Sequence, residues 1–264
     1  MKPIYIESIG IIAPGIENWQ QAEAILAEDG CYQVADLTPL KPSMLKPNER
    51  RRTTLTIKLA LQVVQDALSS SDDYSDLKTI FVSSDGDMDI VNRICQALTL
   101  PDHPVSPTFF HNSVHNAPAG YCSITTGFHA ASTSLSGLNG SFSVGLLDAA
   151  VQATIEQQPV LLISYDTPWP EPLKAFKPHQ QPFGVAMVVR AEPTKHSLAK
   201  LNLSLNLHGD IDQMDDSRLE QLRANTPAAS SLPLLQSIIQ KRSTSLLLPY
   251  LVNEQMSVEI EPCH

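Results

Sequence analysis

Basic residues are scarce in this sequence. It has 18 Lys and Arg against 28 Asp and Glu, so its formal net charge is −10 over 264 residues. Nucleic acids and anionic membranes are held mainly by clustered Lys and Arg side chains, so this balance argues against both as partners. The one basic cluster, Arg50, Arg51 and Arg52, precedes an apolar periodic segment. We interpret it as a solvated helix start, with docking of an acidic carrier protein as the less favoured alternative.

Cysteine is also scarce, and long apolar runs are absent. The four cysteines are Cys31, Cys95, Cys122 and Cys263. They contain no C-x-x-C pair, which argues against a disulfide framework or a structural zinc site and suits a reducing compartment. The longest apolar stretch, residues 246–252, is broken by a proline and is too short to span a bilayer, and the first residues lack a signal-peptide core. We therefore expect a cytoplasmic protein that does not enter the membrane.

The chain is long enough to bury a large core, and 42% of its residues are hydrophobic. Compact apolar segments predict strands at residues 3–12, 77–84, 160–165 and 183–190. Helical spacing predicts helices at residues 18–27, 53–68, 89–98 and 141–157. The alternation suggests one α/β domain with a largely parallel sheet and helices on both faces.

The helix expected at residues 141–157 has a narrow polar stripe. Asp148, Gln152 and Glu156 lie four residues apart on an otherwise small or apolar surface. Side chains at this spacing share one face of a helix. We therefore expect this helix to be almost wholly enclosed by the rest of the protein.

The pattern changes after about residue 200. Residues 201–207 alternate apolar and polar side chains, an acidic loop follows, and residues 228–241 have helical spacing. We expect residues 245–250 and 256–261 to pair as an antiparallel hairpin. Taken together, the elements predict a layered sandwich of helices around mixed sheets.

Two motifs resemble parts of metal sites. His111 and His115 are four residues apart, a spacing that would place both imidazoles on one helix face, but the sequence supplies neither the catalytic glutamate nor a third ligand. We favour packing or hydrogen bonding for both histidines and expect no metal. No G-x-G-x-x-G or Walker pattern occurs, so no nucleotide cofactor is expected either.

The second metal-like motif is a run of alternating aspartates. Asp85, Asp87 and Asp89 imitate the start of a calcium-binding loop. Ile90 stands where the turn glycine is needed, and Gln96 stands where the bidentate glutamate is needed. We therefore interpret the run as a solvated loop or a helix cap.

The segment from Gly137 to Ser141 has the small residues that a tight nucleophile-bearing turn requires, and it lies between a strand-like segment and a helix. No G-x-S-x-G occurs in the chain. Ser141 stays a candidate nucleophile, although a serine enzyme needs a base and an orienting acid that the sequence does not place.

Several segments together resemble one family. They are Ile4–Gly15, Arg52–Leu68, Val105–Gly120 and Pro182–Val188. The most specific signal is His111–Asn116 followed by the Asn-x-x-Ala-Gly pattern that ends at Gly120. In this order they resemble the β-ketoacyl synthases of the thiolase superfamily, most closely the short chain-length-factor-like proteins of aryl polyene and related type II polyketide pathways.

The resemblance implies a thiolase-like layered α/β sandwich that is truncated relative to full ketosynthases. It implies one domain over residues 1–264, with residues 1–190 similar to the ketosynthase N-terminal core and residues 191–264 a shortened, divergent C-terminal part. Active members carry a cysteine in a Thr-Ala-Cys-x-Ser motif at the start of the buried central helix, and Asn139 falls at that position. An amide cannot form the acyl thioester. The family's two histidine contexts are also missing, so the resemblance implies a noncatalytic subunit without a cofactor.

By the same resemblance, such a subunit forms a heterodimer with an active β-ketoacyl synthase, shapes its acyl tunnel and meets the acyl carrier protein through the complex. The residues implied at the tunnel or interface are Phe109, Phe110, His111, Ser113, Val114, His115 and Asn116. Periodicity alone would make the two phenylalanines ordinary core residues.

Two alternatives stay open. The first is a thiolase-fold acyltransferase or hydrolase that uses Ser141 or Cys122 with His111 or His115. The second is a homodimeric scaffold that binds acyl carrier protein without shaping a tunnel, to which the negative charge is an objection because carrier proteins are also acidic.

Overall fold

The computed structural model describes residues 2–28, 32–69 and 74–263, so Cys31 lies outside the described residues. The described residues form a mixed sheet with the strand order β3-β2-β4-β5-β1-β6-β8-β7. The strands are β1 (Ile4–Ile12), β2 (Lys78–Val82), β3 (Ser132–Leu135), β4 (Val160–Asp166), β5 (Phe183–Arg190), β6 (Ala199–Leu207), β7 (Thr244–Leu251) and β8 (Glu254–Pro262). The expected layered α/β architecture is confirmed.

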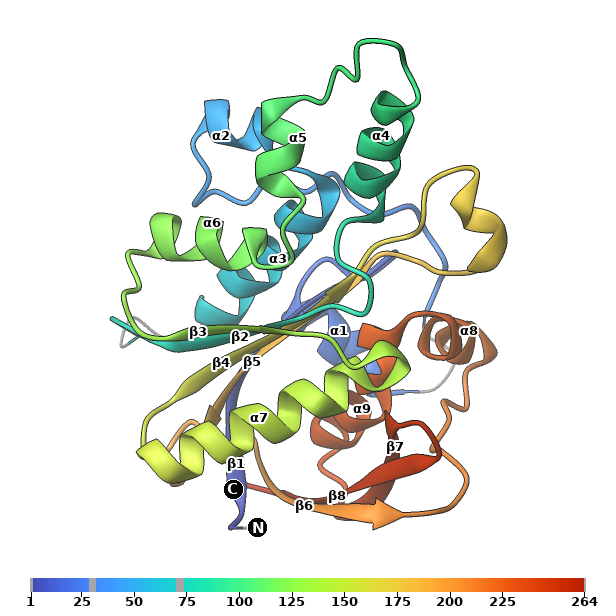
Figure 1. Cartoon of the computed structure of the whole chain (residues 1–264). Helices are drawn as coiled ribbons and strands as arrows, with labels where there is room; N and C mark the ends of the chain where they lie inside the picture. Colours follow the sequence, from blue (N-terminus) through green and yellow to red (C-terminus); the bar gives the residue numbers. More distant parts are fainter. Residues whose placement is uncertain (1, 29–31, 70–73, 264) are drawn as a thin grey trace.

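Helices cover both faces of this sheet (Figure 1). The α-helices are α1 (Trp19–Leu26), α2 (Pro47–Arg52), α3 (Leu55–Leu68), α4 (Met88–Leu98), α5 (Pro107–Asn112), α6 (Ala117–Thr126), α7 (Ser141–Glu156), α8 (Ser217–Asn225) and α9 (Leu232–Ile239). The described residues also form the short 3-10 helices η1 (Leu138–Gly140), η2 (Leu173–Phe176) and η3 (Pro227–Ser231). In the part of the chain that the structure describes, no helix is both long and apolar enough to cross a bilayer.

Two hydrophobic cores lie on opposite faces of the sheet. Val160 and Leu162 of β4 belong to the core that contains α7 and α9, whereas Leu161 and Ile163 belong to the core beneath α3 and α6. Every residue of β4 is buried. A strand covered on both faces needs apolar side chains at successive positions, which explains the continuous apolar run.

The sheet is not largely parallel, so this expectation was wrong. Strand β2 pairs in parallel with β3 and β4, but β4–β5 and β5–β1 are antiparallel. The pairings among β1, β6, β8 and β7 are antiparallel too. An apolar run predicts that a strand is buried, but it does not encode the direction in which the neighbouring strand runs.

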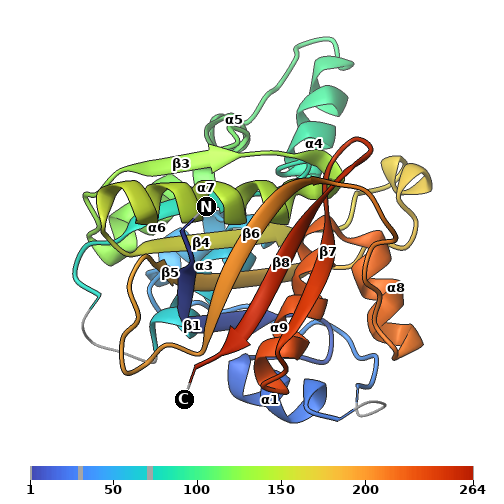
Figure 2. The ribbon, with the colours of Figure 1, turned by 90° about the horizontal axis from the view of Figure 1, so that it is seen from below.

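The helix α7 lies across the parallel end of the sheet, as Figures 1 and 2 show. Gly145 allows this close packing, because a Cβ atom there would lie 2.4 Å from Cγ2 of Val82. The polar stripe is real, with Gln152 Nε2 donating to Asp148 Oδ2 at 3.0 Å. The helix is not enclosed as expected, since its outer side leaves the apolar side chain of Ile155 75% exposed.

The C-terminal part extends the same sheet. The expected hairpin is confirmed as the antiparallel pair β7 and β8. The helix expected at residues 228–241 is divided into η3 and α9, with Pro233 in the first turn of α9. The acidic segment contains the unpredicted helix α8, which Asp216 caps by accepting hydrogen bonds from two backbone N–H groups.

The arginine cluster was expected to lie at the start of a helix, but it lies at the end of one. Arg50, Arg51 and Arg52 form the last turn of α2, and α3 starts only at Leu55 after the N-cap Thr54. Cationic side chains near a helix C-terminus interact favourably with its exposed carbonyl groups.

Candidate functional site: a turn after the parallel strands and an open sheet edge

The turn between β3 and α7 holds the position at which the resemblance places a nucleophile. It is closed by hydrogen bonds of Ser141, whose Oγ donates to the Leu138 carbonyl at 2.7 Å and accepts from Gly137 N at 3.0 Å. Leu138 is the residue of the turn with a left-handed backbone, at φ 53°. Ser141 is fully buried. Its hydroxyl therefore holds the turn together and has no access to a substrate from solvent.

Strand β7 packs directly on this turn. A Cβ atom built on Gly140 would lie 1.6 Å from the carbonyl oxygen of Tyr250, so only glycine fits there. This contact joins the end of the N-terminal part to the C-terminal hairpin. The neighbouring Asn139 is exposed and lies at the mouth of a cavity of about 410 Å³ between the two parts.

Behind the turn, a buried carboxylate ties together the carboxyl ends of the parallel strands. Asp166 Oδ1 accepts from Ser83 Oγ at 3.1 Å and from both N and Oγ of Ser84 at 2.8 Å. Its Oδ2 accepts from Ala228 N in η3 at 2.9 Å. Ser136 Oγ donates to the Ser84 carbonyl at 2.8 Å, which connects the turn to this network. Burial raises the pKa of Asp166 to about 6, against the opposing effect of these hydrogen bonds.

Cys122 is the second candidate nucleophile of the enzyme alternative. It lies on the inner face of α6 in the core beneath α3 and is 1% exposed. Burial raises the pKa of its thiol to about 12. A thiol in such surroundings stays protonated at neutral pH and is inert as a nucleophile.

The two histidines are not on one helix, so their spacing does not bring the imidazoles onto one helix face. His111 belongs to α5, which ends at Asn112, and His115 follows in the turn before α6. Pro118 in the first turn of α6 starts a new helix. A nitrogen of His115, Nε2, lies 2.9 Å from the carbonyl oxygen of Leu135, so the imidazole joins this turn to the end of β3.

The aspartate run forms a loop and a helix cap, as interpreted from the sequence. Asp85 accepts from Trp169 Nε1 at 3.1 Å and from Lys177 Nζ at 2.5 Å. Asp87 caps α4, and Asp89 pairs with Arg93 one turn later. Within residues 2–28, 32–69 and 74–263, no cluster of three or more His, Cys, Asp or Glu side chains could hold a metal.

The tunnel and interface candidates lie on α5 and in the turn between α5 and α6. Phe110 is 67% exposed on α5, and Val114 beyond the helix is exposed too. Phe109 is half-buried beneath the guanidinium of Arg93, whose Cζ lies 5.4 Å from the ring centroid. Ser113 Oγ closes α5 by donating to the Phe110 carbonyl at 2.8 Å. Of the remaining candidates, His111 and Asn116 are exposed and His115 is half-buried.

One edge of the sheet is open among the described residues. Strand β3 ends the strand order, and the Ala131 and Leu135 carbonyls accept hydrogen bonds from β2. Alternate residues of a strand bond to opposite sides, so the backbone groups of Ser132 and Ser134 point away from β2. Such an edge is a template for pairing with another chain.

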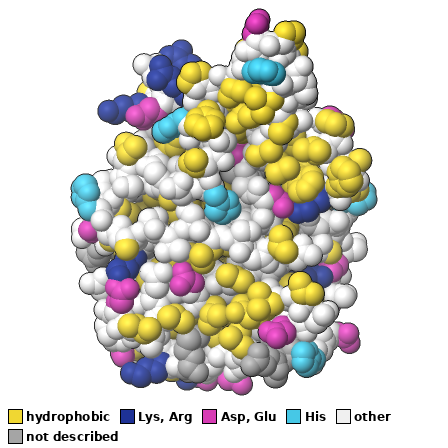
Figure 3. Space-filling model, in the orientation of Figure 1, with side chains coloured by type: hydrophobic (Ala, Val, Ile, Leu, Met, Phe, Trp, Pro, Cys, Tyr) yellow, Lys and Arg dark blue, Asp and Glu magenta, His cyan; other side chains and the backbone are white. Residues whose placement is uncertain are grey.

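Apolar side chains surround this open edge. Helices α6 and α7 both contact β3, and each leaves a large apolar side chain exposed, Ile124 on α6 and Ile155 on α7. Figure 3 shows hydrophobic side chains gathered over α4 and α5 and again along α7 on the same face. A large exposed apolar surface on a folded protein marks an interaction site. This surface was not predicted from the sequence because its residues come from four separate segments.

The mixed sheet and its helical layers define the class of protein as thiolase-like. The model of the β-ketoacyl synthase N-terminal domain matches residues 17–250. This chain belongs to that family. No curated protein matches the chain.

Solved structures share the fold at low sequence identity. The ketosynthase ApeO in complex with its chain length factor ApeC from Xenorhabdus doucetiae matches at 19% identity and TM-score 0.76, covering 98% of this chain and 99% of that chain. The ishigamide ketosynthase/chain length factor matches at 13% identity and TM-score 0.74, covering 100% of both chains. A β-ketoacyl synthase from Burkholderia phymatum STM815 matches at 12% identity and TM-score 0.59, covering 92% of this chain and 71% of that chain. This chain is shorter than a full ketosynthase.

Proposed function

We propose that this chain is a noncatalytic, chain-length-factor-like subunit that forms a heterodimer with an active β-ketoacyl synthase and shapes its acyl tunnel. The pathway we propose is aryl polyene or related polyketide or fatty-acid biosynthesis in the cytoplasm. We also propose that residues 1–264 are one domain, in which residues 191–264 are a shortened counterpart of the second half of a synthase.

The observation that carries the proposal is the open β3 edge within an apolar surface. Stable subunit interfaces are more apolar than the rest of a protein surface, and an unpaired edge strand adds main-chain hydrogen bonds. The exposed side chains of Phe110, Ile124 and Ile155 need a partner to remove them from water. A second chain of the same fold presents an equivalent edge.

Neither of the two candidate nucleophiles is usable, which supports a noncatalytic role. The turn carries Asn139, whose amide cannot form a thioester. Ser141 is fully buried and bonded within its own turn, and the Cys122 thiol is buried with a raised pKa. These features argue against the acyltransferase or hydrolase alternative.

Structures of similar proteins support the choice of partner. Two of the matched structures are ketosynthases with a chain length factor, and a third is AntDE:AntF, a type II acyl carrier protein in complex with its ketosynthase bound to the hexaketide. The AntDE:AntF match has 12% identity, TM-score 0.73 and 99% coverage of both chains. By analogy, we propose that the carrier protein reaches this chain through the complex.

Within this proposal, the two phenylalanines have different tasks. Phe110 is exposed and would contact the partner, with Ser113, Val114, His111, His115 and Asn116 around it. Phe109 is half-buried and held by Arg93, so it has the rigidity required to set the end of a cavity. Exchanging Phe109 for Ala is expected to lengthen or broaden the products, whereas Val252→Ala at the exposed turn between β7 and β8 should leave them unchanged.

The test is to co-express this chain with a candidate ketosynthase from the same source and to purify the complex by a tag on this chain. We expect a stoichiometric complex that elongates carrier-protein-bound chains only when both subunits are present. Intact-mass analysis after treatment with a reactive acyl thioester should show labelling of the synthase and none of this chain. Failure to retain any synthase, or acylation of this chain, would refute the proposal; a stable homodimer would favour the scaffold alternative.

A further inference from the structure

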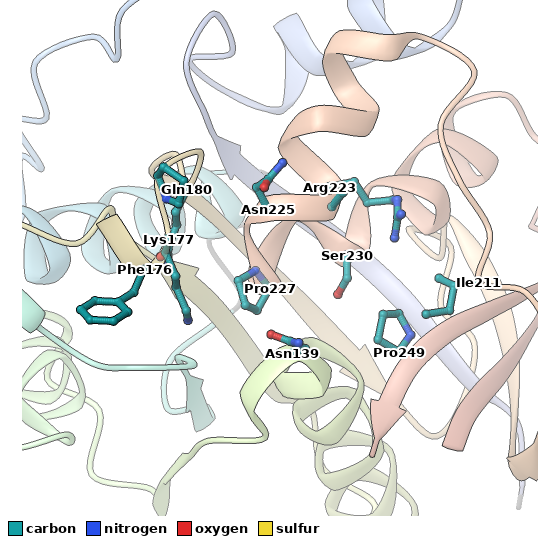
Figure 4. Close-up of a pocket in the computed structure, with 12 residues that line it drawn as sticks. Asn139, Phe176, Lys177, Gln180, Ile211, Arg223, Asn225, Pro227, Ser230 and Pro249 are labelled. Carbon is teal, nitrogen blue, oxygen red and sulfur yellow. The ribbon is translucent and has the colours of Figure 1, made fainter. Parts of the chain in front are cut away.

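The cavity beside the turn that contains Asn139 is lined, among the described residues, by cationic side chains and by no carboxylate. It is lined by Asn139, Phe176, Lys177, Pro178, Gln180, Ile211, Arg223, Ala224, Asn225, Pro227, Ser230 and Pro249 (Figure 4). Two of these described residues are cationic and none carries a carboxylate. The chain as a whole has a net charge of −10. A cavity of this composition in an acidic protein favours an anion over a cation.

Arg223 is held in place with part of its guanidinium unused. Its Nε and Nη2 donate to Glu220 Oε2 and Oε1, both at 2.6 Å, and its side chain is only 10% exposed. The remaining Nη1 group donates to no acceptor among the described residues. Because Glu220 fixes the plane of the guanidinium, a ligand that accepts from Nη1 meets a preorganised donor.

Further hydrogen-bonding capacity lies in the cavity wall. The side chains of Gln180 and Ser230 are 3% and 2% exposed, and the amide of Gln180 and the hydroxyl of Ser230 have no hydrogen-bond partner among the described residues. Buried polar groups without a partner are rare in folded proteins and call for an explanation, such as an absent ligand or ion. Lys177 lies on the opposite side of the cavity, as Figure 4 shows, and its charge is balanced by Asp85, whose Oδ2 lies 2.5 Å from its Nζ.

The rest of the wall is apolar. Ile211, Pro227 and Pro249 line one side, and Phe176 lines the other. The volume of about 410 Å³ far exceeds the space that one or two waters fill. The side of the site that holds Arg223 and Ser230 therefore combines hydrogen-bond donors with the apolar walls of Ile211 and Pro249, which suits an organic anion better than an inorganic one.

We propose that this cavity binds a small organic acid noncovalently, with its carboxylate at Nη1 of Arg223 and its apolar part against Ile211 and Pro249. The ligand forms no covalent bond, because Asn139 at the mouth offers no nucleophile. The proposal goes beyond the role of the chain as a subunit and does not depend on the synthase partner.

The test is a calorimetric titration of the full chain, alone or in its complex, with hexanoate and with its neutral analogue hexanamide at low ionic strength. We expect hexanoate to bind about tenfold more tightly than hexanamide, the effect of one charge-assisted hydrogen bond. Arg223→Gln should remove this preference. Arg218→Gln is the matched control, because Arg218 is on the same helix, pairs with Asp216 and does not line the cavity.

A second pair of variants keeps the test valid if Arg223→Gln unfolds the protein. Ala224 lines the cavity and is exposed, so it tolerates larger side chains. Ala224→Glu places a carboxylate in the cavity and should weaken hexanoate binding about tenfold relative to Ala224→Gln, which adds the same volume without charge. Equal affinities for hexanoate and hexanamide, or no saturation by hexanoate at about 20 mM, would overturn the proposal. Loss of the synthase complex with hexanoate binding intact would overturn only the subunit role.

Discussion

The two edges of the sheet are built in opposite ways. On the outer side of β7, Leu247 N donates to Asp212 Oδ2 at 2.7 Å and the Leu247 carbonyl accepts from Asp212 N at 3.0 Å. Pro249 on the same strand has no N–H to offer. On the outer side of β3, the backbone groups of Ser132 and Ser134 have no neighbouring strand among the described residues. The chain thus protects the β7 edge with its own loop and leaves the β3 edge available to another chain.

Apolar side chains are exposed near both edges, at Leu251 and Val252 where β7 ends and on the flanking helices beside β3. The side chains of Ile124 and Ile155 are each 75% exposed on the helices that flank β3. At the β7 end, the sheet instead packs on the turn that contains Gly140. Substitutions at the β7 edge, which is closed within the subunit, should lower the free energy of unfolding. Substitutions at the open β3 edge should instead weaken binding of the partner.

The largest effect is expected at the closed edge. Gly140→Ala would place a Cβ atom 1.6 Å from the Tyr250 carbonyl oxygen, so the turn or β7 must move. We expect a loss of at least about 3 kcal/mol in the free energy of unfolding, measured by urea titration. Gly120→Ala on α6 is the matched control, because no atom lies within 4 Å of the position that its Cβ would occupy, and its stability should rise slightly. Equal effects of the two changes would contradict the contact.

The next effect concerns the open edge. Ser134→Pro removes an outward-facing N–H without touching the hydrogen bonds to β2. We expect it to weaken the complex with the synthase by about 2 to 3 kcal/mol, or about a hundredfold in Kd, while the subunit stays folded by circular dichroism. Ser134→Ala, which keeps the N–H, should bind normally.

The equivalent change at the other edge sharpens this comparison. Ser245 lies two residues before Leu247, so its backbone faces the same outer side of β7. Ser245→Pro should leave the complex intact, because that edge faces a loop of its own chain. If Ser245→Pro and Ser134→Pro weaken the complex equally, the open edge is not the interface.

A smaller effect is expected from the apolar surface. Ile124→Asp introduces a charge that must be desolvated when the surface is covered, and we expect Kd for the synthase to rise about tenfold. Val252→Asp is the matched control, because this valine is also exposed but lies at the turn between β7 and β8. Surface plasmon resonance on the purified subunits measures Kd for both variants. A normal Kd for Ile124→Asp would place the interface elsewhere.

Sequence patterns predicted buried elements well and their arrangement less well. β4 and β5 could be found because burial on both faces requires continuous apolar runs. Helix α8 was missed because it buries only Leu219 and Leu222, and its remaining side chains are polar apart from Ala224. Strand direction and the division of the helix after residue 226 depend on tertiary packing and on proline positions, which periodicity does not capture.

The site was predicted only in part for a similar reason. The turn at Asn139 could be found because glycines and a following helix mark it locally. The cavity beside it is assembled from η2, α8, η3 and β7, and its cations look in the sequence like ordinary surface residues. The open edge was equally hidden, because an unpaired strand has no sequence signature of its own.

The smallest effect concerns Asp166, which joins the end of β2 to η3. Burial raises its pKa to about 6 from 3.8, so folding favours the protonated form. The stability that protonation contributes is fully present below the unfolded pKa and is lost as the pH rises through about 6. Between pH 7.5 and 5.5, the wild type should gain about 1 kcal/mol relative to Asp166→Asn. Urea titrations of both proteins at the two pH values measure this difference, which isolates Asp166 from the other titrating groups. A difference that does not change with pH would mean that Asp166 stays ionised across this range, held by its four hydrogen bonds to Ser83, Ser84 and Ala228.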